Sequence, residues 1–517
     1  MATRTSRRTR VSFARLLLVL VAVAVVGWFL VRTITSAVAG PDVPGPATFT
    51  GYVDVTAVPS YSFETPEGAP ESDVTLAFVV ADPEDACAPS WGGYYSLDEA
   101  SDELEIDRRI VQLRSVGGHV RVSFGGQANA ELALACTDHD ALVAAYRDVV
   151  DRYELDSIDL DVEGAALDDA ASIERRADAI ATLQDERPAD DPLAVWLTLP
   201  VAQQGLTAAG ESAVDATLAA GVDLAGVNGM AMDFNNGLSA SSQQSDAVLD
   251  AGRALQRQVV TLYGQHGVDL DEVDGWSRTG LTVMIGQNDV AAERFTLADA
   301  EVVNQFALDR GLGLLSMWSL NRDATCTAPL PSVTTVVQTS CSGIDQQGMS
   351  FAAALSDDLP ARSVSPALAT ATPEPSDQSD TTQRPSSPRE PEDDPATSPY
   401  PIWDPLGTYP AGTKIVWHRQ VYEAKWWTSG VAPGSAPVAA DDPWTLVGPV
   451  LPGDTPAPLA TLPAGTYPDW DPEETYTAGD RVLLDQVPYE AKWWSEGTEP
   501  GTHVAGGSPW VLILPTE

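Results

Sequence analysis

The sequence predicts an α/β fold in which a (β/α)8 barrel is followed by two small all-β modules. Strand-like apolar segments alternate with amphipathic segments between residues 49 and 320, with no long interruption. One of these strands carries an acid at every second position. Towards the C-terminus, an aromatic-rich unit occurs twice. A chain of 517 residues is also long enough for more than one domain.

The barrel prediction depends on eight segments with the composition of buried strands. The candidate strands are residues 49–55, 74–80, 119–126, 155–163, 193–201, 224–234, 281–288 and 312–320. Between them, apolar residues recur at helical spacing, as in the sets Leu142, Tyr146, Val149 and Tyr153, and Ile173, Ala177, Ile180 and Leu183. Eight strands alternating with helices over this length predict a TIM barrel.

The fourth strand is the candidate site of chemistry. Residues 158–163 alternate branched apolar side chains with the acids Asp159, Asp161 and Glu163. In a barrel, the apolar side chains face the helices and the acids face the lumen. Carboxylates this close repel one another, so at least one is expected to stay protonated in a shielded site, as a general acid requires. The alternative is a solvated acidic strand edge. Asp156 is out of phase and is interpreted as a capping residue at the start of the strand.

The acids form a longer motif, Asp156-x-x-Asp159-x-Asp161-x-Glu163. It resembles in full the DxxDxDxE signature of the family-18 glycoside hydrolases, the chitinase family. Three further motifs resemble that family in the same order, namely Ser123-Phe124-Gly125-Gly126, Met230-Ala231-Met232-Asp233 and Ser316-Met317-Trp318-Ser319. The resemblance covers about 280 residues and implies a chitinase barrel at residues 48–350.

The resemblance also implies a reaction that uses the substrate's own acetamido group. Glu163 would protonate the glycosidic oxygen, and the carbonyl of the sugar in subsite −1 would attack its anomeric carbon to give an oxazolinium ion. Asp161 would hydrogen-bond the acetamido N–H, with Asp159 sharing its proton. Water would then open the ring with Glu163 as base. The substrate would be a β-linked N-acetylglucosamine polymer or oligomer.

Five further residues are candidate sugar contacts. Trp318 is expected to form the floor of subsite −1, with a barrel-core tryptophan as the alternative. Tyr52 and Gln287, at the ends of strands one and seven, are either sugar contacts or core and loop residues. Met232 stands where many family members have a tyrosine that donates to the acetamido oxygen, so that donor must come from elsewhere. Asp233 is expected to be a polar contact or a loop cap.

The C-terminal repeat predicts two modules, at residues 400–450 and 467–517. Tyr422-Glu-Ala-Lys-Trp-Trp427 returns as Tyr489-Glu-Ala-Lys-Trp-Trp494. Units this small cannot bury all their tryptophans, so exposed rings are expected to stack on sugars, while Trp444 and Trp510 are assigned to the cores. The repeats resemble the chitin-binding modules of carbohydrate-binding families 5 and 12. The candidate chitin-binding residues are Trp403, Trp426, Trp427, Trp470, Trp493 and Trp494.

Composition limits the ligands and the compartment. A net charge of −45 and a pI near 4.1 argue against nucleic acid and anionic membranes, whereas a neutral polysaccharide is compatible. The four cysteines allow three pairings, of which Cys87 with Cys136 and Cys326 with Cys341 is the simplest. Disulfides indicate an oxidising compartment. No Cys/His cluster suggests a metal, and we expect no cofactor and a monomer.

The two remaining segments are a leader and a linker. Residues 1–40 place several arginines before an uncharged apolar run at 16–31, which predicts a signal segment or an uncleaved membrane anchor, with the anchor slightly favoured. The rest of the chain would then be extracellular. Residues 361–399 are rich in Pro, Ser, Thr and acids, as in an extended linker.

The sequence therefore favours a chitinase that acts on polymer. The first alternative is a non-catalytic chitin-binding protein, which the intact Glu163 and Asp161 argue against. The second is an endo-β-N-acetylglucosaminidase acting on glycoprotein glycans, which modules for insoluble polysaccharide make less fitting.

Overall fold

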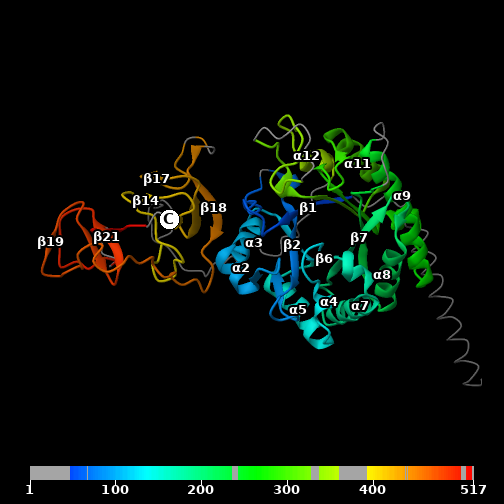
Figure 1. The fold of residues 1–517 in the computed structure, drawn as a ribbon, viewed down its shortest axis with the longest axis horizontal. Coiled ribbons are helices and arrows are strands. Elements are labelled where there is room, and N and C mark those ends of the chain that lie inside the picture. The colour runs from blue at the N-terminus through cyan, green and yellow to red at the C-terminus, as the bar shows by residue number, and fades with distance from the viewer. Residues whose placement is uncertain are drawn as a thin grey trace, which may run out of the picture.

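The computed structural model describes residues 47–66, 68–235, 243–327, 337–359, 393–436, 438, 441–501 and 508–514. Within these ranges, the barrel and the two small β-modules follow one another in a row, in the order of the sequence (Figure 1). The predicted leader at 1–40 and residues 361–392 of the predicted linker lie outside the described residues. In the part of the chain that is described, no helix has the length and apolar character needed to cross a membrane.

The predicted barrel is confirmed. Its eight parallel strands close in the order β1-β13-β10-β9-β7-β6-β5-β2, with β2 pairing back to β1. They are β1 (Thr48–Asp54), β2 (Asp73–Ala81), β5 (His119–Gly125), β6 (Ser157–Asp161), β7 (Ala194–Ala202), β9 (Leu224–Met230), β10 (Thr279–Met284) and β13 (Leu314–Trp318). Each predicted strand therefore overlaps one barrel strand.

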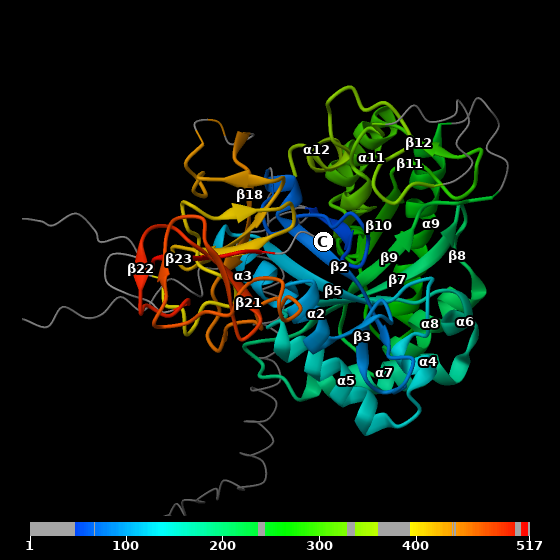
Figure 2. The same cartoon turned by 60° about the vertical axis from the view of Figure 1, so that its left-hand side comes forward.

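Helices surround the barrel (Figure 2). They are α2 (Leu97–Glu103), α3 (Ile106–Ser115), α4 (Leu132–Ala135), α5 (His139–Arg152), α6 (Gly164–Asp168), α7 (Ala170–Asp185), α8 (Ala208–Ala219), α9 (Gln244–Gln265), α10 (Glu272–Ser277), α11 (Leu297–Arg310) and α12 (Phe351–Ser356), with 3-10 turns η1 (Ala69–Glu71) and η2 (Leu320–Arg322). Side chains of Asp138 and Asp169 cap α5 and α7. The two predicted apolar sets on these helices are buried in the core.

Short antiparallel strands of two or three residues, too short for the strand pattern to predict, either extend the barrel sheet (β3, β4 and β8) or pair with each other in a separate ladder (β11 and β12). They are β3 (Pro89–Trp91), β4 (Tyr95–Ser96), β8 (Gly205–Leu206), β11 (Gly286–Gln287) and β12 (Arg294–Phe295). Both predicted disulfides are present, with S–S distances of 2.02 Å for Cys87–Cys136 and 1.98 Å for Cys326–Cys341. Both disulfides connect segments that follow barrel strands, at the end of the barrel where barrel enzymes place their active sites.

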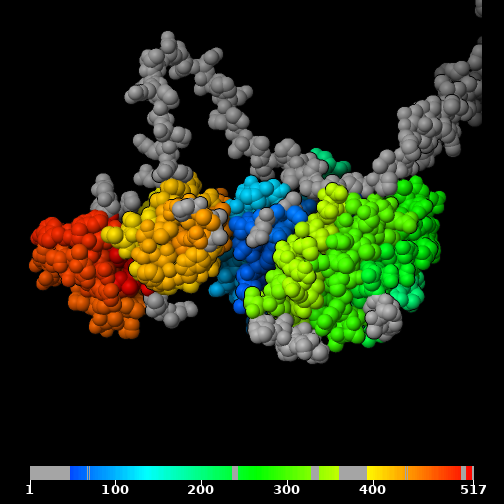
Figure 3. Space-filling view, turned by 90° about the horizontal axis from the view of Figure 1, so that it is seen from above, coloured from blue at the N-terminus to red at the C-terminus, as the bar shows by residue number. Residues whose placement is uncertain are grey.

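The two modules share one topology. A two-stranded ladder and a three-stranded sheet form each of them. The first has β14 (Thr408–Tyr409), β15 (Lys414–Trp417), β16 (Gln420–Ala424), β17 (Thr428–Ser429) and β18 (Trp444–Pro449), and the second has β19 (Thr475–Tyr476), β20 (Arg481–Leu484), β21 (Val487–Ala491), β22 (Ser495–Glu496) and β23 (Trp510–Leu512). Trp444 and Trp510 are buried core residues, as expected. In the space-filling view, the first module (yellow to orange) lies against the blue N-terminal part of the barrel (Figure 3).

Candidate active site

Asp159 lies at the centre of a buried polar network inside the barrel. Its carboxylate accepts hydrogen bonds from Tyr52 Oη at 2.8 Å, Ser123 Oγ at 2.6 Å and Thr198 Oγ1 at 2.5 Å. Burial raises the pKa of Asp159, while these three hydroxyl donors act in the opposite direction. The donors come from β1, β5 and β7, so three strands fix the position of one carboxylate on β6.

Asp161 is the next acid along β6 and has no comparable set of donors. Its side chain is buried, and its Oδ1 atom has no hydrogen-bond partner among the described residues. Burial raises the pKa of Asp161 far above its usual range, and the neighbouring charges of Glu163 and Asp159 raise it further. A buried carboxyl oxygen without a partner is suited to bind a ligand group that enters the cavity.

Glu163 follows the end of β6 and precedes α6. Its backbone is extended, with φ −141° and ψ 174°, and its side chain does not cap the helix. Burial raises the pKa of the Glu163 carboxyl, which favours the protonated form that a general acid needs. The three acids therefore lie in a row from the barrel interior to the cavity at its C-terminal end, as the strand period predicted.

The Ser123-Phe124-Gly125-Gly126 motif has a physical explanation in the structure. A Cβ atom on Gly125, which has φ +106°, would lie 2.0 Å from the backbone oxygen of Asp161. A Cβ atom on Gly126 would lie 2.9 Å from the ring of Phe78. The glycines thus let β5 approach the acidic strand and make room for an aromatic residue beside the site.

The acids open into a cavity of about 310 Å³. Asp161 and Glu163 line it together with Tyr52, Met232, Asp233 and Trp318, so the structure brings most of the predicted site residues together. Trp318 stacks on Phe78, with ring centroids 5.4 Å apart and an interplanar angle of 21°. An aromatic wall next to carboxyl groups is suited to hold the apolar face of a sugar ring.

Asp233 caps a loop, as one of the two roles considered for it requires, and its position at the cavity leaves the polar contact to a sugar as a prediction. It lines the cavity, and its Oδ1 atom accepts a hydrogen bond of 2.8 Å from the backbone N–H of Val290. Burial raises its pKa. Met232 contributes an apolar surface and no donor, as its side chain requires.

Gln287 does not line the cavity, so the prediction of a sugar contact is wrong and the loop alternative holds. Its side-chain N–H groups lie within hydrogen-bonding distance of four backbone oxygens in its own loop, including those of Asn288 at 3.0 Å and Glu293 at 3.2 Å. Its Oε1 atom accepts a hydrogen bond of 2.8 Å from Arg294 Nε. The amide is therefore fully used in holding the turn between β11 and β12.

Several cavity residues were not predicted. They are Phe78, Gln127, Thr198, Pro200, Val201, Met230, Thr282, Met284 and Asp289. Gln127 directly follows the glycine motif, so its position in the chain was an available indication. Phe78 lies in the uninterrupted apolar run 76–81 of β2, and such a run does not reveal which face reaches the site.

The aromatic pairs of the modules are exposed. The exposed fractions are 46% and 62% for Trp426 and Trp427, and 43% and 60% for Trp493 and Trp494. Both members of each pair can be exposed because the pair lies in the bend after β16 or β21 rather than within a strand, where adjacent side chains would face opposite ways. Trp403 and Trp470 differ from these pairs. Each is half-buried against its module core, held by a backbone bond to β15 or β20.

Comparisons with known proteins match both parts of the chain. The profile of carbohydrate-binding module family 5/12 matches residues 469–511. The chain is 38% identical over 255 residues to a probable bifunctional chitinase/lysozyme of Escherichia coli (strain K12), covering 48% of this chain and 28% of that protein. It is 36% identical over 273 residues to endochitinase 11 of Metarhizium anisopliae, covering 52% of this chain and 49% of that protein.

A solved structure matches the barrel. The catalytic domain of a hyperthermophilic chitinase from Pyrococcus furiosus aligns with a TM-score of 0.50 and 26% identity, over 60% of this chain and 95% of that one. The chain spans between about a quarter and a half of the lengths of the two curated relatives. It therefore joins a barrel similar to the catalytic domains of chitinases to a C-terminal module of carbohydrate-binding family 5/12.

Proposed function

We propose that this protein is a chitinase that hydrolyses β-1,4-linked N-acetylglucosamine polymers. The observation that carries the proposal is the row of acids formed by the buried Asp159 and Asp161 and the half-buried Glu163, which ends in a cavity walled by Trp318 and Phe78. The similarity of the barrel to chitinases supports the same substrate class. The intact acids argue against a purely binding role.

The proposed reaction proceeds with retention through the substrate's acetamido group. Glu163, whose pKa is raised by burial, donates a proton to the glycosidic oxygen. The acetamido oxygen attacks the anomeric carbon as the bond to the leaving sugar breaks, which gives an oxazolinium ion. The free Oδ1 atom of Asp161 accepts the acetamido N–H and stabilises the positive charge. Water then attacks the anomeric carbon and passes a proton to Glu163, which restores the enzyme.

Substrate comparison tests this proposal. Purified protein should release soluble oligosaccharides from colloidal chitin and should not cut fully deacetylated chitosan, because glucosamine has no acetamido oxygen to attack the anomeric carbon. Product analysis by chromatography with mass detection measures both. Rapid cleavage of the deacetylated polymer would exclude the acetamido route, and inactivity on both polymers would exclude a chitinase.

We also propose that both modules bind chitin, the second of which contains the match to the family profile. The first module has the same topology and an equally exposed aromatic pair. Replacing Trp426 and Trp427, or Trp493 and Trp494, with alanine should weaken adsorption to insoluble chitin, because each stacking contact contributes about 1 kcal/mol beyond its buried area.

Soluble oligosaccharides should be hydrolysed at an unchanged rate by these variants, which provides the activity control. The variant Trp444→Ala provides a structural contrast, because it removes a core ring and should lower the melting temperature of the first module. Adsorption isotherms and thermal melts measure the two effects. Undiminished adsorption after replacement of all four exposed tryptophans would contradict the proposal.

We infer in addition that the described part of the chain works outside the cell. The two disulfides support an oxidising compartment. Fractionation of the native host, followed by N-terminal sequencing, measures location and cleavage together. Recovery of the intact protein in the cytosol would contradict the inference.

A further inference from the structure

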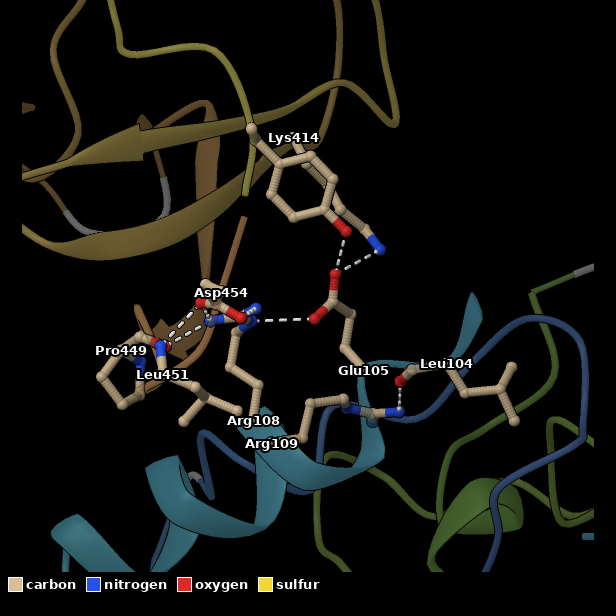
Figure 4. A network of polar contacts seen from close by, with 9 residues as sticks. Leu104, Glu105, Arg108, Arg109, Lys414, Pro449, Leu451 and Asp454 are labelled. Carbon is tan, nitrogen blue, oxygen red and sulfur yellow. Dashed lines mark hydrogen bonds and ion pairs between the residues drawn. The ribbon is translucent and has the colours of Figure 1, made fainter. Parts of the chain in front are cut away.

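A buried network of charges joins the barrel to the first module (Figure 4). Glu105, at the start of α3, accepts hydrogen bonds from the Tyr400 hydroxyl and from Lys414 Nζ, the latter at 3.1 Å. On the same helix, Arg108 contacts Glu105 Oε2 at 2.8 Å and Asp454 Oδ2 at 3.0 Å. Only 5% of each of the Glu105 and Arg108 side chains is exposed. Reversal of the charge on one partner would place like charges side by side in this buried network.

Close packing accompanies these ion pairs. A Cβ atom on Gly448 of β18 would lie 2.8 Å from the backbone oxygen of Arg108 and 3.1 Å from Cβ of Gln112. Burial alone would raise the pKa of Glu105, but the cations Lys414 and Arg108 bring it below its usual value. The contact therefore holds ionised groups in fixed positions, as in a permanent interface rather than a loose tether.

The register of the module's sheet fixes its orientation on the barrel. In the β16–β18 ladder, Gln420 pairs with Pro449 and Ala424 pairs with Trp444. The Pro449 end contacts Arg108 in the first turn of α3. The Trp444 end lies with Leu320 and Asp323, which follow β13 at the catalytic end of the barrel. Lys425 directly follows Ala424 at this end of β16, and Trp426 and Trp427 come next, in the bend after the strand.

A second cavity, of about 640 Å³, lies between the two bodies at that end. The barrel contributes Tyr61 and Thr65 from the loop after β1, and Leu320 from the turn after β13. The module contributes Lys425 and Thr445. Leu320 is two residues beyond Trp318 of the active-site cavity, and Lys425 directly precedes Trp426. The lining also includes the carboxyl groups of Glu71 and Asp323. Hydroxyl, ammonium and carboxyl groups beside aromatic residues are suited to bind sugar units.

We infer that the cavity between the barrel and the first module is an additional binding site for sugar units of a long chitin chain, and that the fixed module guides this chain between Trp426–Trp427 and the active-site cavity. This inference rests on the proposed function. It assigns the first module a role in positioning polymer that a freely tethered module does not have. The second module is not required for it.

The experiment separates the module from the barrel without touching either binding surface. Asp454→Arg places a like charge beside Arg108, and Asp454→Asn is the matched control that keeps an acceptor oxygen. Lys414→Glu, on β15, disrupts the same network of charges between the barrel and the module, which is called the joint below. Spin labels on cysteines introduced at the exposed Val302 and Leu406 report the distance between barrel and module. All four native cysteines are disulfide-bonded, so the introduced thiols react alone.

We expect one narrow distance in the parent and in Asp454→Asn, and a broad distribution in Asp454→Arg and Lys414→Glu. Those two variants should release products from crystalline chitin roughly 10-fold more slowly, since the aromatic pair no longer shares a fixed geometry with the cavity. Hydrolysis of a soluble chitotetraose should stay at the parent rate. Asp190→Arg, on the exposed loop between α7 and β7, controls for the change of net charge.

Combining the charge reversal with the tryptophan replacements tests whether the joint and the tryptophan pair act on crystalline chitin through the same effect. Asp454→Arg combined with Trp426→Ala and Trp427→Ala should be no slower on crystalline chitin than the tryptophan variant alone. Additive losses, or an undiminished rate in a variant whose distance distribution is broad, would overturn the inference. A narrow distance in both joint variants would overturn the role of the charge network. If the parent fails to cut even soluble oligosaccharides, the proposed function itself fails, which is a different result.

Discussion

Replacing Glu163 with glutamine is expected to lower kcat on soluble chito-oligosaccharides by about 10²–10⁴-fold, the usual contribution of a general acid. The amide cannot donate the proton that the leaving oxygen needs. The side chain of Glu163 makes no cap hydrogen bond to α6, so its replacement should leave the fold intact. Steady-state kinetics on a chromogenic chito-oligosaccharide measures the loss.

The control for this variant is Asp156→Asn, which changes an acid of the same motif at the other end of the strand. Asp156 contacts His119 at 2.7 Å, and 53% of its side chain is exposed. Its replacement should leave turnover close to that of the parent. Chitin adsorption and the melting temperature should be retained in Glu163→Gln. A Glu163→Gln protein that kept a tenth of the parent turnover would contradict the assignment of Glu163 as the acid.

The fold was predictable because, in a barrel, the two-residue period of a strand shows which side chains face the lumen, and the C-terminal end of the strand shows where the site lies. On β6, Leu160 points into the core while Asp159 and Asp161 point into the lumen, and the alternation is visible in the sequence. The end of the strand then places Glu163 at the catalytic end. The exposed tryptophan pairs were also predictable as a class, because modules this small cannot bury all their rings.

Other features depend on contacts that no local pattern encodes. Gln287 follows a strand end just as a substrate-binding residue would, and only the loop's backbone oxygens decide its role. Phe78 can be recognised as a residue of the site only once its stacking contact with the ring of Trp318 is known. The contact between Glu105 and Lys414 joins residues 309 positions apart. Each charge alone resembles an ordinary surface residue in a chain this acidic.

Replacing Asp161 with asparagine is expected to lower kcat by about 10²–10³-fold. A loss of this size is usual when one preorganised group that stabilises the transition state is removed. The same change should stabilise the fold at neutral pH. The pKa of Asp161 in the folded protein is raised far above its unfolded value by burial and by the charges of Glu163 and Asp159. As pH rises from the unfolded pKa of about 3.9 towards the folded one, the unfolded chain loses this proton first, so the folded state loses stability.

The asparagine side chain does not titrate, so the folded state of the variant should not lose stability over this pH range. Its melting temperature should match that of the parent near the unfolded pKa and should exceed it by a growing margin as pH rises through the folded pKa. The margin is expected to reach a few degrees, because each kcal/mol corresponds to about 2–4 °C in a domain of 150–250 residues. Calorimetry from pH 4 to pH 8, alongside kinetics, measures both effects. A margin independent of pH would show that Asp161 does not hold its proton through burial, and near-normal turnover would remove it from the reaction.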